Sequence, residues 1–396
     1  MANAILSEKK QTVPDVAARL AELKARHRDS DNWDGLSQLL DEMGALTGAA
    51  EWNERDFDRG ILLYGAGSIG AGALDYFKRR GINVVGFLDD TPGREGGEYY
   101  GVDIMPSECA RDGAHPIVIS IKDWNLPALK LSAAGLRFEA FSHHVFHTNL
   151  AQLNTVARDL LVDDRSRYVL LRILKANIFA DYSFYHPAFE GNQYWAIPEF
   201  QYIAPDPKGV MVDAGAYVGD TVEEFVWRTR GVFDCIHAFE PNPRLLSAMR
   251  QRAGRLQQEW ALREGAIRCN QAGLGEEESG LPFFDPGVGN MAGSFLFSHG
   301  TEVGTLCVRT LDNYLAGAPV TFLKADIEGF EMPLLRGAAA SVGRFAPRVA
   351  ICLYHRITDL FEIPLYLKSL VPGYKMAIRH HSLSQDESVL YCWVSC

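Results

Sequence analysis

The sequence predicts an α/β protein with two sheet-containing domains. Its 396 residues exceed the size at which a single hydrophobic core keeps growing. Short apolar runs alternate with amphipathic stretches in two separate series, 56–148 and 205–396, a pattern typical of βαβ units and largely parallel sheets. The last two runs, 374–378 and 389–394, are separated only by a polar turn, so they must pair antiparallel.

Helical periodicity marks the start of the chain. Residues 13–27 and 35–47 carry apolar side chains at helical spacing, at Val16, Leu20 and Leu23 and at Leu36, Leu39, Leu40, Met43 and Leu46. We therefore expect a helical segment over residues 1–55.

The first α/β series occupies residues 56–148. Its strand candidates are the runs 61–64, 84–88 and 117–121. A linker, 149–204, follows. It looks helical to residue 176, and its aromatic part, 177–204, is either a lid that stacks on a sugar or packing between the domains, the commoner fate of such rings.

The second series opens at Gly209, after three prolines, and yields about seven strand candidates. They are 210–213, 235–240, 266–269, 321–326, 349–354, 374–378 and 389–394. The expected architecture is a parallel sheet that ends in an antiparallel hairpin.

Composition and charge exclude several classes of protein. Apolar residues at 47% and charged residues at 22% exclude a largely disordered chain. The net charge of −11 argues against a nucleic-acid or anionic-membrane binder, because both need clustered cations. We expect no nucleic-acid partner, and the oligomeric state stays open.

Cysteine usage and the N-terminus point to the cytoplasm. The seven cysteines are Cys109, Cys235, Cys269, Cys307, Cys352, Cys392 and Cys396. They show neither metal spacing nor a disulfide framework, which favours buried thiols in a reducing compartment. The first residues lack a signal-peptide core, and no stretch is long enough to span a bilayer.

The turn after the first strand of the second series carries the sharpest motif. Asp213, Gly215 and Gly219 follow the strand, and Glu240 closes the next one. Small residues let the backbone approach a ligand, and an acidic residue at the second strand end can accept both ribose hydroxyls. Asp213 disfavours a pyrophosphate and favours a cationic nucleoside such as S-adenosylmethionine. The alternative is a purely structural turn.

The motifs of the C-terminal half resemble those of FkbM-type S-adenosylmethionine-dependent methyltransferases. They are 213–221, 238–243, 310–312, the Asp-Ile-Glu-Gly-Phe-Glu run at 326–331, and Tyr354-His355. The resemblance covers about residues 190–396, and the run at 326–331 is its most specific part.

This resemblance implies a class I methyltransferase fold and methyl transfer to a hydroxyl of a sugar or natural product. Asp213, Gly215 and Gly219 would then line the methionine part of the cofactor, and Glu240 would bind its ribose. Gln193 and Tyr194 match a Gln-Tyr pair that could close over the cofactor. Trp195 stands where a phenylalanine is more usual.

Acceptor chemistry would fall to residues at the fourth and fifth strand ends. Asp326 is the first candidate for positioning or deprotonating a hydroxyl, with an N-cap of the helix near Phe330 as the alternative. His355 is the second candidate base, or a structural histidine. Glu328 and Glu331 could bind Mg²⁺ with Asp326, or complement a helix dipole. We predict no established metal site; Asp326 and Glu328 are the residues that could form one.

The remaining histidines have less direct interpretations. His380 and His381 end the sixth strand and could line an acceptor pocket, but we expect a solvated pair. His143, His144 and His147 lack a cysteine or carboxylate at metal spacing, which favours a surface loop over a metal site.

The first α/β series carries a second glycine-rich turn. Gly65, Gly67 and Gly70 follow a strand and open a helix, and Asp89 and Asp90 end the next strand. The segment resembles small Rossmann-type modules beside sugar-modifying enzymes, where a nucleotide-sugar can bind. Without a catalytic Tyr–Lys pair, a binding or assembly module is favoured over a dehydrogenase, and a fold used only for packing is the alternative.

The sequence thus predicts two Rossmann-like domains and, as leading function, an S-adenosylmethionine-dependent O-methyltransferase in carbohydrate modification. Its acceptor would be a glycan, a nucleotide-linked sugar or a related metabolite. An NAD(P)-dependent oxidoreductase or epimerase using residues 65–70 is the first alternative. A non-catalytic nucleotide-sugar-binding scaffold is the second.

Overall fold

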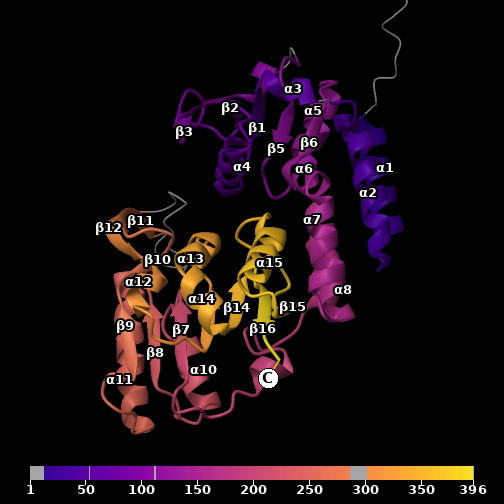
Figure 1. The fold of residues 1–396 in the computed structure, drawn as a ribbon. Coiled ribbons are helices and arrows are strands. Elements are labelled where there is room, and N and C mark those ends of the chain that lie inside the picture. The colour runs from indigo at the N-terminus through magenta and orange to yellow at the C-terminus, as the bar shows by residue number, and fades with distance from the viewer. Residues whose placement is uncertain (1–12, 53, 111–112, 286–300, 396) are drawn as a thin grey trace, which may run out of the picture. The chain divides into compact units, whose positions relative to one another are not determined.

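The chain forms two compact units (Figure 1). Unit 1 comprises residues 1–151 and 171–184, and unit 2 comprises residues 152–170 and 185–396. The structure, a computed structural model, describes residues 13–52, 54–110, 113–285 and 301–395.

Unit 1 begins with a series of helices that includes the two predicted from the periodicity. They are α1 (Val13–His27), the short turn η1 (Trp33–Gly35), α2 (Leu36–Thr47), η2 (Ala49–Glu51) and α3 (Glu54–Asp58). The apolar face of α2, from Leu36 to Leu46, is buried. The prediction of helices over 13–27 and 35–47 is therefore confirmed.

A six-stranded sheet with the order β3-β4-β2-β1-β5-β6 forms the core of unit 1. Its strands are β1 (Ile61–Tyr64), β2 (Val84–Leu88), β3 (Glu98–Tyr99), β4 (Val102–Met105), β5 (Ile117–Ile119) and β6 (Phe138–Ala140). All pairs are parallel except β3 with β4. The accompanying helices are α4 (Ser68–Arg79), η3 (Ser107–Ala110), α5 (Asn125–Ala133) and α6 (Phe141–Thr148).

The histidine group of unit 1 does not lie in a surface loop, as we expected, but on helix α6. His143 is buried, and its Nε2 lies 2.8 Å from the carbonyl oxygen of Ile178. Phe141, Val145 and Phe146 are buried on the same helix and explain why the segment folds inward. The expectation of a loop is wrong because these apolar residues have helical spacing.

The predicted helical linker is an interrupted helix. It consists of α7 (Leu150–Thr155), a π-helical turn η4 (Val156–Leu160) and α8 (Asp164–Phe179), followed by η5 (Tyr182–Phe184). The first part of α8 belongs to unit 2 and the second to unit 1. Within unit 1, the buried Lys175 donates to the carbonyl oxygens of His27 and Ser30.

Unit 2 is built on a seven-stranded sheet with the order β15-β16-β14-β13-β7-β8-β9. Its strands are β7 (Val210–Ala214), β8 (Cys235–Phe239), β9 (Ile267–Asn270), β13 (Phe322–Ala325), β14 (Arg348–Cys352), β15 (Lys375–His380) and β16 (Ser388–Trp393). Only β16 runs antiparallel to its neighbours, β14 and β15. The predicted fold class is confirmed: a mixed α/β chain whose parallel C-terminal sheet ends in an antiparallel hairpin.

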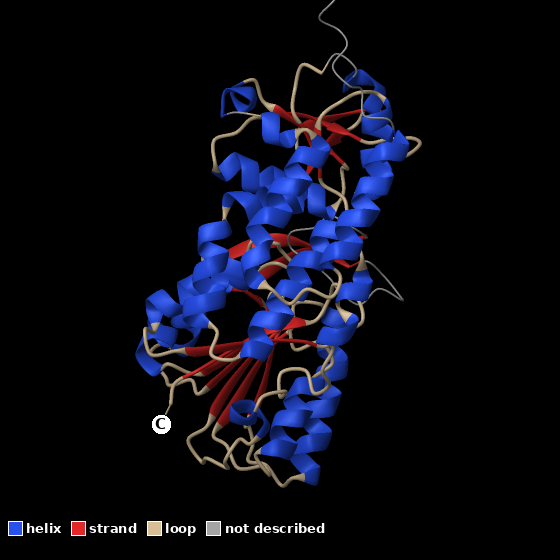
Figure 2. Cartoon of the chain, turned by 90° about the vertical axis from the view of Figure 1, so that its right-hand side faces the viewer, coloured by secondary structure: helices blue, strands red, loops and turns tan. Residues whose placement is uncertain are grey.

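Helices lie on both faces of this sheet (Figure 2). The helices of unit 2 that follow the linker are η6 (His186–Ala188), α9 (Pro198–Gln201), α10 (Asp220–Arg228), α11 (Pro243–Glu259), α12 (Leu311–Leu315), α13 (Glu331–Gly337), α14 (Ala339–Phe345) and α15 (Asp359–Leu370). The carboxyl ends of β7, β8, β13 and β14 therefore open into loops between helices, where ligands bind in such sheets.

A second, three-stranded sheet in unit 2 was not predicted. It consists of β10 (Gly273–Leu274), β11 (Ser279–Asp285) and β12 (Thr301–Arg309), in the order β10-β12-β11. Gly280 and Pro282 interrupt β11, and both residue types weaken a strand pattern. The segment forms a strand because it pairs antiparallel with β12, not because its own sequence favours one.

The aromatic segment 177–204 mostly packs inside the units. Phe179, Phe184, Tyr185, Tyr194, Trp195 and Phe200 are buried, whereas Tyr182, Phe189 and Tyr202 are exposed. In unit 2 the ring of Trp195 stacks on Phe322 at 5.1 Å, and Phe200 meets the same ring edge-on. These rings serve as core, which explains why a tryptophan is accommodated at position 195.

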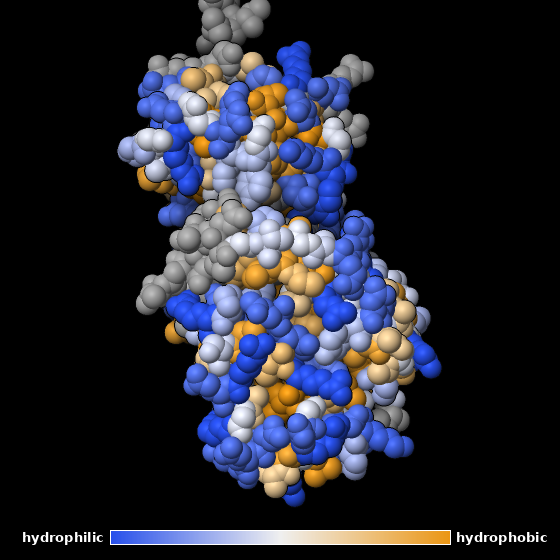
Figure 3. Space-filling model, turned by 90° about the vertical axis from the view of Figure 1, so that its left-hand side faces the viewer, coloured by the Kyte–Doolittle hydropathy of each residue, from blue (hydrophilic) through white to orange (hydrophobic). Residues whose placement is uncertain are grey.

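Hydrophilic and hydrophobic residues are interspersed on the face of the molecule shown in Figure 3. The exposed large hydrophobic residues are Tyr100, Leu126, Val162, Tyr182, Phe189, Tyr202, Trp227, Val232, Leu383 and Val394, and they are distributed over both units. Within the described residues, no helix has both the length and the apolar character needed to cross a membrane.

The cysteines of the described part are all free. Cys235, Cys352 and Cys392 are buried and Cys269 is partly so, as expected for most of them, but Cys109 and Cys307 are exposed. Cys396 lies outside the described residues.

Candidate functional site

The loop between β7 and α10 requires glycine at two positions. Gly215 has φ +75°, and a Cβ atom there would lie 1.8 Å from the carbonyl oxygen of Asp326. Gly219 has φ +81° and precedes the first turn of α10. Left-handed backbone favours glycine, and the close approach to β13 at Gly215 excludes any side chain. The spaced glycines therefore fix how this loop lies over the sheet.

A buried ion pair lies beneath this loop. Asp213 is wholly buried, and its Oδ1 lies 3.2 Å from Nζ of Lys324 on the neighbouring strand. Lys324 also donates to the carbonyl oxygen of Gly215 at 2.6 Å. Burial by itself lowers the pKa of Lys324, but the charges of Asp213 and Asp326 outweigh it and raise that pKa. Asp213 thus positions Lys324, which in turn fixes the loop through the Gly215 carbonyl oxygen.

Glu240 lies directly after β8 and faces the same loop. Its Oε2 accepts a hydrogen bond from the Tyr217 backbone N–H at 3.0 Å, and its Oε1 accepts one from Asn242 at 2.8 Å. The residue is only 6% exposed, and burial raises its pKa to about 7 against the opposing effect of these two donors. Each carboxylate oxygen keeps a lone pair for a further donor.

Asp326, directly after β13, is clamped by two tyrosines. Tyr194 donates to Oδ2 at 2.7 Å, and Tyr354 donates to Oδ1 at 3.0 Å. Burial raises the pKa of this carboxyl, but Lys324, His355 and the two hydroxyls outweigh burial and lower it. The Asp326 side chain keeps an exposed fraction of 21%. It is an ionised carboxylate at the edge of the sheet.

Asp326 does not cap the helix that follows it. The residue before α13 is Phe330, and no side chain caps that end. Instead Glu331, the first residue of α13, accepts a hydrogen bond from the Ile327 N–H at 3.0 Å. The N-cap alternative for Asp326 is therefore wrong, because Asp326 lies too early in the turn.

His355 lies among three carboxylates. Its Nδ1 is 2.8 Å from Oε1 of Glu331, and its Nε2 is 3.6 Å from both Oδ1 of Asp326 and Oε2 of Glu328. Burial favours the neutral imidazole, but the negative charge around it outweighs burial and raises the pKa of His355 well above its usual value. The protonated form is favoured here.

Three residues near Asp326 or His355 were missed by sequence reasoning. Glu387 lies in the turn between β15 and β16, and Gln193 donates to its Oε2. Burial raises the pKa of Glu387 to about 7. Cys352 ends β14, with its Sγ 3.8 Å from the Tyr194 hydroxyl. Asp359 is buried near His355 and Glu331. Only the position of Cys352 at a strand end offered a signal.

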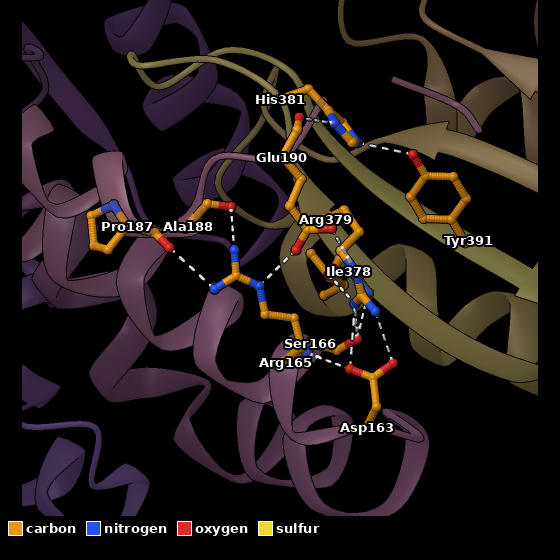
Figure 4. Close-up of polar contacts among 10 residues, drawn as sticks. All are labelled: Asp163, Arg165, Ser166, Pro187, Ala188, Glu190, Ile378, Arg379, His381 and Tyr391. Carbon is orange, nitrogen blue, oxygen red and sulfur yellow. Dashed lines mark hydrogen bonds and ion pairs between the residues drawn. The ribbon is translucent and has the colours of Figure 1, made fainter. Parts of the chain in front are cut away.

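A polar clasp, here Asp163, Arg165, Ser166, Glu190 and Arg379, fixes the segment that leads to Gln193 and Tyr194 (Figure 4). Arg379 on β15 contacts both oxygens of Asp163 at 3.2 and 3.3 Å, and its Nε lies 3.3 Å from Oε2 of Glu190. Arg165 reaches the other Glu190 oxygen at 2.6 Å. Ser166 accepts from Arg379 and from the Ile378 N–H.

His380 and His381 belong to this region and are not a solvated pair. His380 is wholly buried, with its ring stacked on Tyr185 and its Nδ1 2.8 Å from Oγ of Ser388. His381 contacts the carbonyl oxygen of Glu190 and the Tyr391 hydroxyl (Figure 4). The expectation is wrong because pairing with β16 and the preceding segment covers both rings.

The glycine-rich turn of unit 1 has the predicted context. Gly65 to Gly67 connect β1 to α4, and Gly70 lies in the first turn of α4. Gly65 has φ +111°, and a Cβ atom at Gly70 would lie 2.1 Å from the Gly65 carbonyl oxygen. Asp89 accepts from the N–H groups of Ala66 and Thr91 at 3.1 and 2.9 Å. This repeats the arrangement that Glu240 makes in unit 2.

Asp90 is engaged by neighbouring side chains. Tyr64 donates to its Oδ2 at 2.5 Å and Lys130 at 2.7 Å, and the Ser107 N–H donates to its Oδ1. Burial raises the pKa of Asp90, but these donors outweigh it and lower that pKa strongly. Asp90 is thus a structural partner, and Asp89 is the residue that faces the turn.

The segment that carries these residues is similar to a known protein family. Residues 213–375 match the family model of the methyltransferase FkbM domain. The chain is therefore similar to this methyltransferase domain over residues 213–375. Its matched segment begins at Asp213 and includes Glu240, Asp326, Glu331 and His355.

One solved structure shares the fold of this chain, and others resemble parts of it less closely. The methyltransferase FkbM from Methylobacillus flagellatus KT is similar at a TM-score of 0.52 and 20% identity, over 96% of this chain and 100% of that chain. An rRNA methylase from Streptococcus thermophilus gives 0.30 and 14%, over 48% and 89%. Fibrillarin from Aeropyrum pernix, bound to S-adenosyl-L-methionine, gives 0.26 and 13%, over 47% and 66%. No curated protein matches the chain.

Proposed function

We propose that the FkbM domain of unit 2 transfers a methyl group from S-adenosylmethionine to a hydroxyl oxygen of a sugar, glycan or related hydroxylated metabolite. The observation that carries this proposal is the position of Glu240. Its buried carboxylate closes β8 opposite the Gly215–Gly219 loop, in a domain that matches methyltransferases.

The residues at this loop fit the nucleoside end of the cofactor. Glu240 is an acceptor-only group whose charge is penalised by burial, so two ribose hydroxyl donors would stabilise it. Gly215 and Gly219 leave the backbone bare where the methionine part would lie. Because Asp213 is buried and paired with Lys324, we propose that it does not contact the cofactor itself but fixes the position of the loop that does.

Gln193 and Tyr194 support the proposal from the other side. The Tyr194 hydroxyl reaches Asp326, and its ring centroid lies 5.2 Å from Lys324 Nζ. Gln193 donates to the Tyr194 hydroxyl at 3.1 Å and to Glu387. This pair would close over the cofactor at the ends of β13 and β14.

Asp326 is suited to orient the acceptor. When bound, S-adenosylmethionine supplies an electrophilic methyl group, which the acceptor oxygen takes as the carbon–sulfur bond breaks. Asp326 is ionised and anchored by two hydroxyls, so it can hold the acceptor hydroxyl and accept its proton. His355, with its raised pKa, is better suited to stabilise the neighbouring carboxylates than to act as the base.

Cofactor binding tests the proposal directly. Titration calorimetry with S-adenosylhomocysteine should show binding to the full chain, and Glu240→Ala should weaken it at least tenfold, the loss of one charge-assisted hydrogen-bonding group. Glu264→Ala, an exposed carboxylate in the same unit, is the matched control. Absence of binding to the folded wild-type chain would refute the proposal.

Acceptor class is tested by transfer of a labelled methyl group. A panel of sugars, oligosaccharides and nucleotide-linked sugars should yield a labelled product whose methyl group survives alkali, as an ether does and an ester does not. Label found only on nitrogen, carbon or carboxylate acceptors would contradict O-methylation.

We also propose that unit 1 binds a nucleoside-containing ligand such as a nucleotide-sugar. The support is the arrangement of Asp89 and the Gly65–Gly70 turn, which parallels that of Glu240. Titration with uridine diphosphate sugars should then give binding that Asp89→Ala removes and Glu240→Ala leaves unchanged. Co-purified nicotinamide absorbance would instead favour the oxidoreductase alternative.

A further inference from the structure

One cluster in unit 2 holds more ligating groups than the proposed methyl transfer uses. Asp326, Glu331 and His355 each offer an atom, all within 4.8 Å of one another. Glu328 approaches the same imidazole, with its Oε2 3.6 Å from Nε2. These residues come from the β13–α13 connection and from the end of β14, so two neighbouring strand ends place them together.

Buried polar atoms in this cluster lack hydrogen-bond partners. Glu331 is wholly buried and its Oε2 has none, and Asp359, 1% exposed, has none for either oxygen. His355 has a side-chain exposure of 5%, and neither ring nitrogen makes a well-aligned hydrogen bond. Buried polar groups are normally satisfied, so orphaned atoms at one point indicate a missing partner.

The local charge is also unbalanced. Asp326, Glu328 and Glu331 bring three carboxylates against one imidazole. Lys324, whose charge also acts on Asp326, is already paired with Asp213. The positive charge of Arg356 partly offsets the cost of burying Asp359. Buried carboxylates in such excess need a counter-charge.

We propose that Asp326, Glu331 and His355 hold a divalent cation, with Glu328 as a further ligand on the exposed side. The inference deepens the proposed function, and its catalytic meaning rests on that function. A cation next to Asp326 would bind the acceptor's hydroxyl oxygen and favour its deprotonated form.

The donor set indicates the class of metal. One imidazole nitrogen with several carboxylate oxygens suits a first-row ion such as Mn²⁺ better than Ca²⁺, which prefers oxygen ligands alone. Ligand atoms bonded at about 2.1 Å to one ion lie roughly 3.0 to 3.4 Å apart. The separations of 3.6 Å from His355 Nε2 to Asp326 and Glu328 need only a small contraction. Glu331 would have to bind the same ion through its unpartnered Oε2, because its Oε1 lies 2.8 Å from Nδ1 of the same ring.

A neighbouring group, Asp326, Cys352 and Glu387, is less suited to the ion. Cys352 would have to ligate as a thiolate, and its surroundings are apolar and acidic. Glu387 already accepts a hydrogen bond from Gln193. Because the two groups share only Asp326, substitutions can separate them.

Direct metal binding to the full chain is the test. The purified protein is stripped with a chelator, and Mn²⁺ binding is followed by calorimetry and by the loss of the free-ion electron paramagnetic resonance signal. One equivalent should bind, and Glu331→Gln and His355→Gln should each weaken binding by about tenfold or more. Glu328→Gln, at a side chain 30% exposed, should weaken it without endangering the fold.

Glu387→Gln is the matched control and should leave Mn²⁺ affinity unchanged. The proposal is overturned if the stripped wild-type chain binds no Mn²⁺, or if Glu387→Gln abolishes binding while Glu331→Gln and Glu328→Gln retain it. S-adenosylhomocysteine titration of the same samples separates the two proposals. Cofactor binding without metal binding refutes the cation site alone, whereas metal binding without cofactor binding refutes the proposed function.

Discussion

Burial of Glu240 disfavours its charged form, so ligand binding at this residue should depend on pH. Its pKa is raised from the usual 4.5 to about 7 in the folded protein, so the free site carries a proton up to about pH 7. A ligand that needs the carboxylate must displace this proton. S-adenosylhomocysteine should therefore bind about tenfold more weakly at pH 6 than at pH 8, with proton release at the lower pH.

Calorimetry in buffers of different ionisation enthalpy measures that proton release. Glu240→Gln should bind weakly at both pH values and release no proton. The same shift should make the free fold lose stability as the pH rises from about 4.5 to about 7, because only the unfolded chain has already released the proton. Equal affinity of the wild-type protein at both pH values would contradict the assignment of Glu240.

Gly215 offers a second test at a single position. Gly215→Ala forces a side chain into left-handed backbone and against the Asp326 carbonyl oxygen. The left-handed conformation alone costs about 1–2 kcal/mol, and displacement of the loop should also abolish cofactor binding. Urea unfolding and calorimetry measure the two effects.

Gly254→Ala is the matched control. Gly254 lies on the exposed face of α11 with nothing within 4 Å of an added Cβ, so alanine there should stabilise the helix by up to about 1 kcal/mol. Similar behaviour of the two variants would show that the Gly215 turn is not constrained.

The sequence predicts site residues that stand at strand ends. Gly215, Glu240 and Asp326 follow apolar runs, and the carboxyl ends of neighbouring parallel strands meet at one edge. Glu387 and Asp359 could not be found in this way. The first lies in a hairpin turn and the second at a helix start, and only tertiary packing brings them to Asp326 and His355.

At the scale of elements, the polar clasp should stabilise unit 2 and hold the segment before Gln193. Arg379 has a side-chain exposure of only 11% and bridges Asp163 and Glu190. Arg379→Ala leaves both carboxylates without this partner and should cost about 1.5–3 kcal/mol, as for other hydrogen bonds to charged groups. Urea unfolding measures the loss.

Arg263→Ala is the control for this prediction, because its pair with Asp234 is about half exposed. Exposed ion pairs contribute little, so its effect should be smaller. A clasp variant no less stable than this control would mean that Glu190 and Asp163 find other partners.

Elements with strong local patterns could be predicted, and those built by pairing could not. The seven strands of the main sheet of unit 2 lie within a few residues of their apolar runs. Strand β11 contains Gly280 and Pro282, and its register depends on β12. The buried state of His380 depends likewise on pairing with β16 and on Tyr185, which is distant in sequence.

At the scale of the molecule, chain length predicted two units, but the path of the chain between them could not be predicted. Helix α8 has continuous helical character, so no local signal marks the point at which residues 171–184 join unit 1. Residues 171–184 belong to unit 1 because of non-local contacts, among them the hydrogen bonds from the buried Lys175 to the carbonyl oxygens of His27 and Ser30.

Separate hydrophobic cores should give separate unfolding transitions. Leu63 on β1 and Leu323 on β13 are both fully buried in the central strands of their own sheets. Leu63→Ala and Leu323→Ala should each cost about 2–5 kcal/mol, and each should lower only the transition of its own unit in differential scanning calorimetry. S-adenosylhomocysteine at about 100 times its dissociation constant should add about 2.7 kcal/mol to unit 2 alone. The transition that Leu323→Ala lowers should thus be the one that the ligand raises, whereas a single transition shifted equally by both variants would show that the units unfold as one.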